Sequence, residues 1–138
     1  MPRAESVFDL EKFFVALSDR TRLRLLNLMG EDEVCVCFFV EILQENQSKI
    51  SRHLAYLRKA GLVASRKDGK WAHYRITTPA NPHAANMLRN VRNWLEEDRE
   101  MRLERERLVK VCCVPALSET LQNAPRPARL KPLLAPCG

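Results

Sequence analysis

The stretch that most constrains the fold is residues 46–77, which predict a helix with one polar face followed by a tight hairpin. Asn46 is a favourable helix N-cap, and apolar residues recur behind it at the spacing of one buried helical face. These apolar positions are Ile50, Leu54 and Leu57. We therefore expect a helix over 47–59, with Gly61 as its C-terminal stop.

Two runs with the character of β-strands follow that helix, at 62–67 and 71–76. Asp68-Gly69 between them is typical of the two-residue turn of a β-hairpin. We expect Trp71 and Tyr74 to anchor this hairpin. A helix, a turn, a second helix and a hairpin predict a winged helix-turn-helix, and so a mainly α fold with a small β-hairpin (α+β).

Apolar residues at helical spacing predict four further helices, at 7–17, 20–29, 35–44 and 83–110. The last of these is long and carries a single apolar stripe, which Asp98 and Arg105 interrupt. An interrupted stripe indicates a seam against another surface rather than a deep core. The stripe consists of Met87, Val91, Trp94, Leu95, Met101 and Leu108.

The predicted helix and hairpin of residues 46–77 carry almost all of the chain's net charge. They contain eight Lys or Arg and one acid, a net charge of +7, whereas the whole chain carries +6. One basic module on a nearly neutral body is typical of DNA-binding proteins. The helix face would reach base edges and the hairpin tip would reach phosphates. The candidate contacts are Ser48, Lys49, Ser51, Arg52 and Tyr56 on the helix and Arg66, Lys67 and Lys70 on the hairpin.

The chain changes character from Val114 onward, where five of the eight prolines and no aromatic residue occur. Such a composition is typical of a segment that buries little apolar surface. We therefore expect a folded DNA-binding domain over 1–111. A flexible tail that contains cysteine and proline is expected over 112–138.

Several classes of protein do not fit this sequence. No run of about 18 apolar residues is present to span a membrane, and the N-terminus lacks the pattern of a secretory signal. A glycine-rich phosphate loop and a CxxC motif beside a βαβ unit are also absent, so no enzyme activity is expected. We expect a cytoplasmic protein whose partner is double-stranded DNA, with no membrane or RNA partner.

The runs KISRHLAYLRKAGLV and RKDGKWAHYRI resemble the ArsR/SmtB family of winged-helix, metal-responsive repressors, over about residues 8–100. The element Glu33-Val34-Cys35-Val36-Cys37 resembles the metal box of that family, closest to its arsenic and antimony sensors. The resemblance implies that the domain over 1–111 also serves dimerisation. The implied homodimer forms through the first and last helices and represses a metalloid resistance operon. It also implies release from the operator when As(III) or Sb(III) binds cysteine thiolates.

The cysteines present an incomplete ligand set for such an ion. Thiolates are soft ligands and select soft ions over Mg or Ca, and As(III) and Sb(III) prefer three of them. Cys35 and Cys37 supply two. In the branch resembled, a third cysteine often follows three positions later, where this chain has Val40. The expected substitutes are the vicinal residues Cys112 and Cys113, from the same subunit or from the partner.

The spacing of the first two cysteines suggests a mechanism. Residues two apart on a helix point about 200° apart, so Cys35 and Cys37 should not converge on one ion within a helix at 35–44. Ion binding should therefore unwind or bend the start of that helix. That helix should pack against the helix at 47–59, whose orientation decides whether Arg52 and Lys49 reach the DNA groove.

Three alternatives keep the same fold. The ligand could be Cd(II), Pb(II) or Zn(II), and a fourth thiolate would favour Cd(II). The switch could be a thiol-redox reaction, with a disulfide between Cys35 and Cys37 or between Cys112 and Cys113; the second pair could also form a separate site with Cys137. Finally, the winged helix could serve protein contacts alone, which salt-sensitive DNA binding would exclude.

Overall fold

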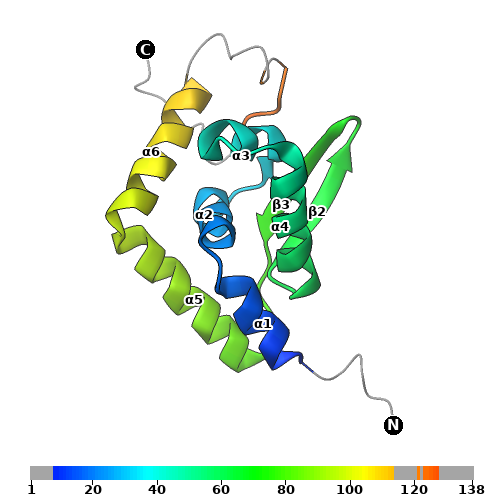
Figure 1. Cartoon of the computed structure of the whole chain (residues 1–138), viewed down its shortest axis with the longest axis vertical. Helices are drawn as coiled ribbons and strands as arrows, with labels where there is room; N and C mark the ends of the chain where they lie inside the picture. Colours follow the sequence, from blue (N-terminus) through cyan, green and yellow to red (C-terminus); the bar gives the residue numbers. More distant parts are fainter. Residues whose placement is uncertain (1–7, 114–120, 122, 128–138) are drawn as a thin grey trace.

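The structure is a computed structural model of the 138-residue chain and describes residues 8–113, 121 and 123–127 (Figure 1). Helices dominate the described part, and its three strands form one antiparallel sheet. The elements are α1 (Leu10–Leu17), α2 (Arg20–Met29), β1 (Val34–Cys35), α3 (Val36–Leu43), α4 (Gln47–Lys59), β2 (Val63–Asp68), β3 (Trp71–Ile76), α5 (Pro82–Glu97) and α6 (Arg99–Cys113). Within these residues, no helix combines the length and the apolar character that crossing a membrane requires.

Short polar side chains fix the starts of most helices. Asp9, Asp19, Asn46 and Asn81 each accept a hydrogen bond from a backbone N–H in the first turn of the helix that follows. These caps satisfy donors that would otherwise lack partners at a helix start. The start of α3 differs, because its N-cap residue is Cys35 and makes no such bond.

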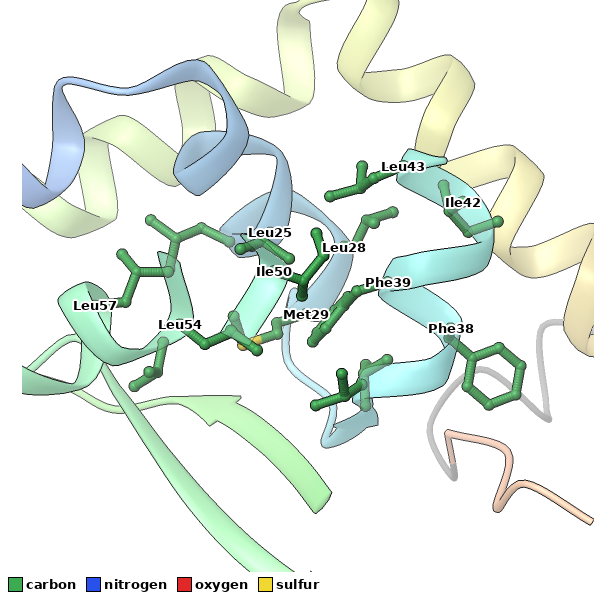
Figure 2. Packing of buried hydrophobic residues seen from close by; sticks show 14 of the residues in the cluster. Leu25, Leu28, Met29, Phe38, Phe39, Ile42, Leu43, Ile50, Leu54 and Leu57 are labelled. Carbon is green, nitrogen blue, oxygen red and sulfur yellow. The ribbon is translucent and has the colours of Figure 1, made fainter. Parts of the chain in front are cut away.

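The core lies between α2, α3 and α4 and continues beneath the sheet (Figure 2). Its largest members are Phe13 of α1, Leu25, Leu28 and Met29 of α2, Phe38, Phe39 and Ile42 of α3, and Ile50, Leu54 and Leu57 of α4. The buried face of α4 is the one that the sequence predicts. The opposite, polar face of α4 is therefore left for solvent or for a partner.

The β2–β3 hairpin confirms the predicted wing, with each strand within one residue of its expected position. Its pairing runs from Val63 opposite Ile76 to Asp68 opposite Trp71. Gly69 in the turn has a φ of 63°, a left-handed conformation that costs glycine little. Figure 1 shows α4 beside this hairpin, on the other side of the molecule from the angled pair α5 and α6.

A third strand, β1, adds to the hairpin and was not predicted. Val34 and Cys35 pair with Tyr74 and His73 of β3, which gives the strand order β1-β3-β2. The helix expected over 35–44 is therefore wrong at its first residue. Cys35 has extended backbone angles, φ −70° and ψ 142°, because this pairing holds it in the sheet.

The single helix expected over 83–110 is also wrong, because the chain breaks at Asp98. This residue has extended angles, φ −77° and ψ 129°, and separates α5 from α6. Its carboxylate accepts a hydrogen bond from the N–H of Met101 at 3.0 Å. The side chain that appeared to interrupt one apolar stripe thus marks the start of a second helix.

Polar contacts fix α6 against α2 of the same chain. Arg20 pairs with Glu100 and Arg24 with Glu104, so two successive turns of each helix are joined. Arg105 donates to the carbonyl oxygen of Leu28 at 2.8 Å, at the C-terminal end of α2, where a positive charge is favourable. The apolar seam predicted over 83–110 is therefore limited to α5, because α6 packs against α2 of the same chain.

The C-terminal part of α6 is also buried. Cys112 is fully buried, and Leu121 and Ala124 belong to the same apolar cluster as the core. The boundary expected between 111 and 112 stays a prediction, and α6 itself continues to Cys113. Most of the segment expected as a tail lies outside the described residues.

Candidate functional site

The polar face of α4 presents the five helix side chains predicted to contact DNA. Ser48, Ser51, Arg52 and Tyr56 are exposed, and Lys49 is half-buried. The ammonium of Lys49 lies 3.3 Å from the carboxylate of Glu45, one turn earlier. A partly exposed pair of this kind can exchange its contact for solvent or for a phosphate. The face is therefore polar, basic and turned away from the core.

A buried arginine behind this face was not predicted from the sequence. The Nε and Nη2 atoms of Arg22 donate to the carbonyl oxygens of Ala16 and Val15, at 2.9 and 3.0 Å. Its Nη1 lies 3.0 Å from Nδ1 of His53, and its guanidinium lies 4.6 Å from the ring centre of Tyr56. Arg22 thus ties the end of α1 to α4. No local pattern distinguishes it from Arg20 and Arg24, the neighbouring and more exposed arginines of α2.

His53 contributes to the position of α4 rather than to its exposed face. Burial is the largest influence on this ring and lowers the pKa of His53, against the opposing effect of the Asp19 carboxylate. The neutral ring can accept the hydrogen bond from Arg22 at Nδ1. His53 therefore helps to hold α4 in the position that exposes its polar face.

The hairpin carries the three other predicted DNA contacts, and all three are exposed: Arg66, Lys67 and Lys70. Arg66 is engaged with Glu33. Its Nη2 lies 2.7 Å from one carboxylate oxygen, and its Nε lies 3.1 Å from both. The hydrogen bonds from Arg66 lower the pKa of Glu33, so the carboxylate stays charged. This bidentate pair joins β2 to the residue just before β1.

Cys35 and Cys37 converge, contrary to the helical geometry expected for them. Their sulfur atoms lie 2.9 Å apart, with Cys35 buried and Cys37 half-buried. Because Cys35 ends β1 and Cys37 lies in the first turn of α3, the rotation of about 200° between helical neighbours does not apply. The pair needs no unwinding of α3 to face one ion.

The two thiols share a hydrogen bond that separates their acidities. The hydrogen bond from Cys37 is the main reason that the pKa of Cys35 is lowered to about 7. Backbone N–H groups of Cys37 and Ala72 act in the same direction, and burial opposes them. The pKa of Cys37 is raised, because its proton is held by Cys35 and because it is buried. At neutral pH the pair therefore offers a thiolate beside a thiol.

This arrangement predicts an acidic thiol at residue 35. In a variant that keeps only Cys35 and Cys37, thiolate absorbance in the ultraviolet should reach half of its first step near pH 7. Changing Cys37→Ala removes the hydrogen bond to the thiolate, so the midpoint should rise. A first midpoint near the ordinary value of about 8.5 in both proteins would contradict this geometry.

The structure does not bring Cys112 into this pair. Burial raises the pKa of Cys112 to about 11, so its thiol is protonated at neutral pH. Within the described part of the chain, no three His, Cys, Asp or Glu side chains gather as a metal site would require. The side chains of Cys113 and Cys137 lie outside the described residues. A third ligand from 112–113 thus requires a rearrangement or the partner subunit.

Comparisons with known proteins agree on one family. The sequence model described as "Bacterial regulatory protein, arsR family" matches residues 19–65. The chain is 45% identical over 78 residues to the arsenical resistance operon repressor of Escherichia coli K12, which covers 56% of this chain and 67% of that protein. It is 40% identical over 90 residues to the arsenic resistance transcriptional regulator ArsR1 of Pseudomonas putida, which covers 62% and 70%.

Two further proteins are also similar to this chain, a cadmium resistance regulator and a solved homodimeric domain. The cadmium resistance regulatory protein CadC of Listeria innocua is 45% identical over 65 residues, which covers 46% of this chain and 55% of CadC. Among solved structures, the homodimeric winged helix-turn-helix domain of Mb0332 from Mycobacterium bovis matches with a TM-score of 0.51 and 26% identity. That match covers 65% of this chain and 84% of the other.

Proposed function

Because this chain belongs to the ArsR family of transcriptional regulators, we propose that it acts as a homodimer and represses a metalloid resistance operon. The family and these relatives are DNA-binding regulators, and the chain is a winged helix-turn-helix repressor of that family. The proposed inducer is As(III) or Sb(III). The observation that carries this proposal is the convergence of Cys35 and Cys37, 2.9 Å apart, at the start of α3.

The DNA contacts are proposed on the exposed basic surface of α4 and the wing. Ser48, Lys49, Ser51, Arg52 and Tyr56 would lie in the major groove, and Arg66, Lys67 and Lys70 would contact phosphates. The support is geometric, since the core holds α4 by its opposite face and leaves these side chains exposed or half-exposed. Binding to operator DNA also implies a cytoplasmic location.

Exposed apolar side chains on α1 and α5 support the proposed homodimer. These are Leu10 and Phe14 on α1 and Met87 and Trp94 on α5. Large apolar side chains that stay exposed in the monomer can mark a protein interface. Trp94 is the most exposed of them, at 75%. A two-fold dimer would place two copies of α4 on successive half-sites of an inverted repeat.

The choice of inducer follows from the number of sulfur donors. Cys35 and Cys37 supply two, and Cys112 or Cys113, from either subunit, is proposed to supply the third. Three thiolates suit As(III) and Sb(III), whereas Cd(II) would gain from a fourth. Cd(II), Pb(II) and Zn(II) are the second candidates, because CadC, the cadmium resistance regulator, is among the relatives.

A thiol-redox switch is a further candidate that one observation favours. The thiolate of Cys35 beside the thiol of Cys37 is the arrangement from which a disulfide forms. Hydrogen peroxide would accept two electrons and two protons from the pair, giving one disulfide and two waters. Release of DNA by peroxide without any ion, reversed by a dithiol, would support this alternative.

The role of α4 can be checked at Arg52, which is exposed. Changing Arg52→Ala should weaken operator binding by about 1–3 kcal/mol, because a groove contact is lost while the core is untouched. Fluorescence anisotropy at several salt concentrations would measure the affinity. The matched control is Arg102→Ala, which removes an exposed arginine from α6. Equal affinity for the Arg52 variant and the parent would contradict the assigned face.

The proposed inducer is tested by titrating ions into the complex between the reduced protein and DNA from its own promoter. Anisotropy should fall on adding arsenite or antimonite at low micromolar concentration, while Cd(II), Pb(II) and Zn(II) act more weakly. Release by the divalent ions alone would move the function to the second candidates. A complex that no ion disturbs would contradict metal sensing of either kind.

A further inference from the structure

One ion pair joins the candidate ion site to the wing. Glu33 lies two residues before Cys35, and its carboxylate holds the guanidinium of Arg66 in β2 through contacts of 2.7 to 3.1 Å. Glu33 itself belongs neither to the cysteine pair nor to the proposed DNA contacts. The pair is only partly exposed, with side-chain exposures of 54% for Arg66 and 28% for Glu33. Its bidentate geometry fixes the direction of Arg66.

The register of the sheet explains why this pair can form. Cys35 lies opposite His73 in β3, and His73 lies opposite Arg66 in β2. These three residues therefore form one row across the sheet. Since side chains alternate along an extended chain, Glu33 lies on the same side as Cys35. Glu33 and Arg66 thus connect the outer strands β1 and β2 across β3.

Ion binding must move the two sulfurs apart. Two sulfurs bound to one ion at about 2.3 Å, with an angle of roughly 95° at the ion as in a trigonal pyramid, lie about 3.4 Å apart. The sulfurs of Cys35 and Cys37 lie 2.9 Å apart without an ion. Loading the site therefore requires the two sulfurs to separate by about 0.5 Å.

The strand side of the site is the easier one to displace. The first turns of α3 are anchored by Phe38 and Phe39, which are fully buried in the core. Val34 and Cys35 are also buried, but β1 consists of these two residues and pairs with β3 alone. Displacement should therefore fall on β1, which directly follows Glu33.

We propose that Glu33 is a positioning residue that transmits ion binding at Cys35 and Cys37 to the wing through Arg66. This inference rests on the proposed function and names a route for its regulation. In the ion-free protein, Glu33 holds Arg66 in a fixed direction from which the guanidinium can also bind a phosphate of the DNA. A displaced β1 carries the carboxylate with it and withdraws the guanidinium from that position.

The test compares Glu33→Gln with Glu106→Gln, which removes the same charge from an exposed site on α6. Operator affinity is measured with and without arsenite, and arsenite affinity is measured on the free protein. In the parent and in the Glu106 variant, arsenite should weaken DNA binding about 100-fold. In Glu33→Gln, arsenite should bind as tightly as in the parent but weaken DNA binding by less than about 10-fold.

A second variant separates transmission from a merely structural contact. Arg66→Lys keeps the charge for phosphate but loses the bidentate fork. If the two residues act as one unit, Glu33→Gln and Arg66→Lys should reduce the arsenite effect equally, and the double variant should reduce it no further. Losses that multiply in the double variant would overturn the proposal.

Two other outcomes are also decisive. If Glu33→Gln lowers the melting temperature but keeps the full arsenite effect, the ion pair is structural only and the proposal is overturned. If the unmodified protein is not released by any ion, the proposed function itself fails. That result is seen before any variant is made, so the two failures are distinguishable.

Discussion

Replacing both Cys35 and Cys37 by serine is expected to abolish the release of DNA by arsenite. Hydroxyl groups at these positions are not soft donors, so the double variant should lose the ion site. A typical release of about 100-fold corresponds to a coupling of about 2.7 kcal/mol, and all of it should disappear. Anisotropy of the operator complex, with and without arsenite, measures this loss.

The DNA affinity of the ion-free double variant should stay within about threefold of the parent, because neither cysteine lies on the exposed face of α4 or at the hairpin tip. A matched control is Cys137→Ser, which removes a thiol far along the chain from this pair. Full release of the double-serine protein by arsenite would show that other groups bind the inducer.

Changing Trp94→Glu is expected to have the second large effect, by separating the dimer. Removing a large aromatic side chain from the centre of an interface typically costs about 2–4 kcal/mol, and a two-fold interface contains it twice. A carboxylate at the same place would lose that stabilisation and would be costly to bury. The variant should sediment as a monomer at micromolar concentration.

Operator affinity of the Trp94 variant should fall at least about 100-fold, since a monomer engages a single half-site. The matched control is Leu103→Glu, which places the same charge on a side chain of α6 that is 47% exposed. That variant should remain dimeric and bind DNA normally. A dimeric Trp94→Glu protein, or a monomeric Leu103→Glu protein, would contradict an interface through α5.

Helix α4 and the β2–β3 hairpin were predictable because the sequence patterns that specify them are local. Asn46 caps α4, and three apolar residues at helical spacing define its buried face. Asp68-Gly69 marks the hairpin turn, and the observed strands lie within one residue of the prediction. The same locality let the eight candidate DNA contacts be chosen from charge and spacing. Their role in binding stays a prediction.

The break between α5 and α6 was missed because Asp98 is compatible with two structures, one long helix or two shorter ones. In the sequence, Asp98 appears as a polar interruption in an apolar stripe. In the structure it caps a new helix, whose carboxylates Glu100 and Glu104 pair with arginines on α2. Those ion pairs join residues about 80 positions apart, and no local pattern reports them.

The geometry of the cysteine pair was missed for a similar reason. A strand of two residues carries almost no signal of its own, and β1 exists because β3 pairs with it. The placement of Cys35 in this strand brings the two sulfurs together and makes one of them acidic. The contacts of Arg22 with α1 and α4, and of Glu33 with Arg66, likewise depend on tertiary structure.

The central claim is that ion binding at the cysteine pair and DNA binding weaken each other. The most direct test measures the arsenite affinity of the protein alone and of its operator complex. Linkage requires that DNA weakens arsenite binding by the same factor by which arsenite weakens DNA binding. We predict that arsenite binds the complex about 100-fold more weakly than the free protein. Equal affinity in the two states would contradict the coupling, however tightly arsenite binds.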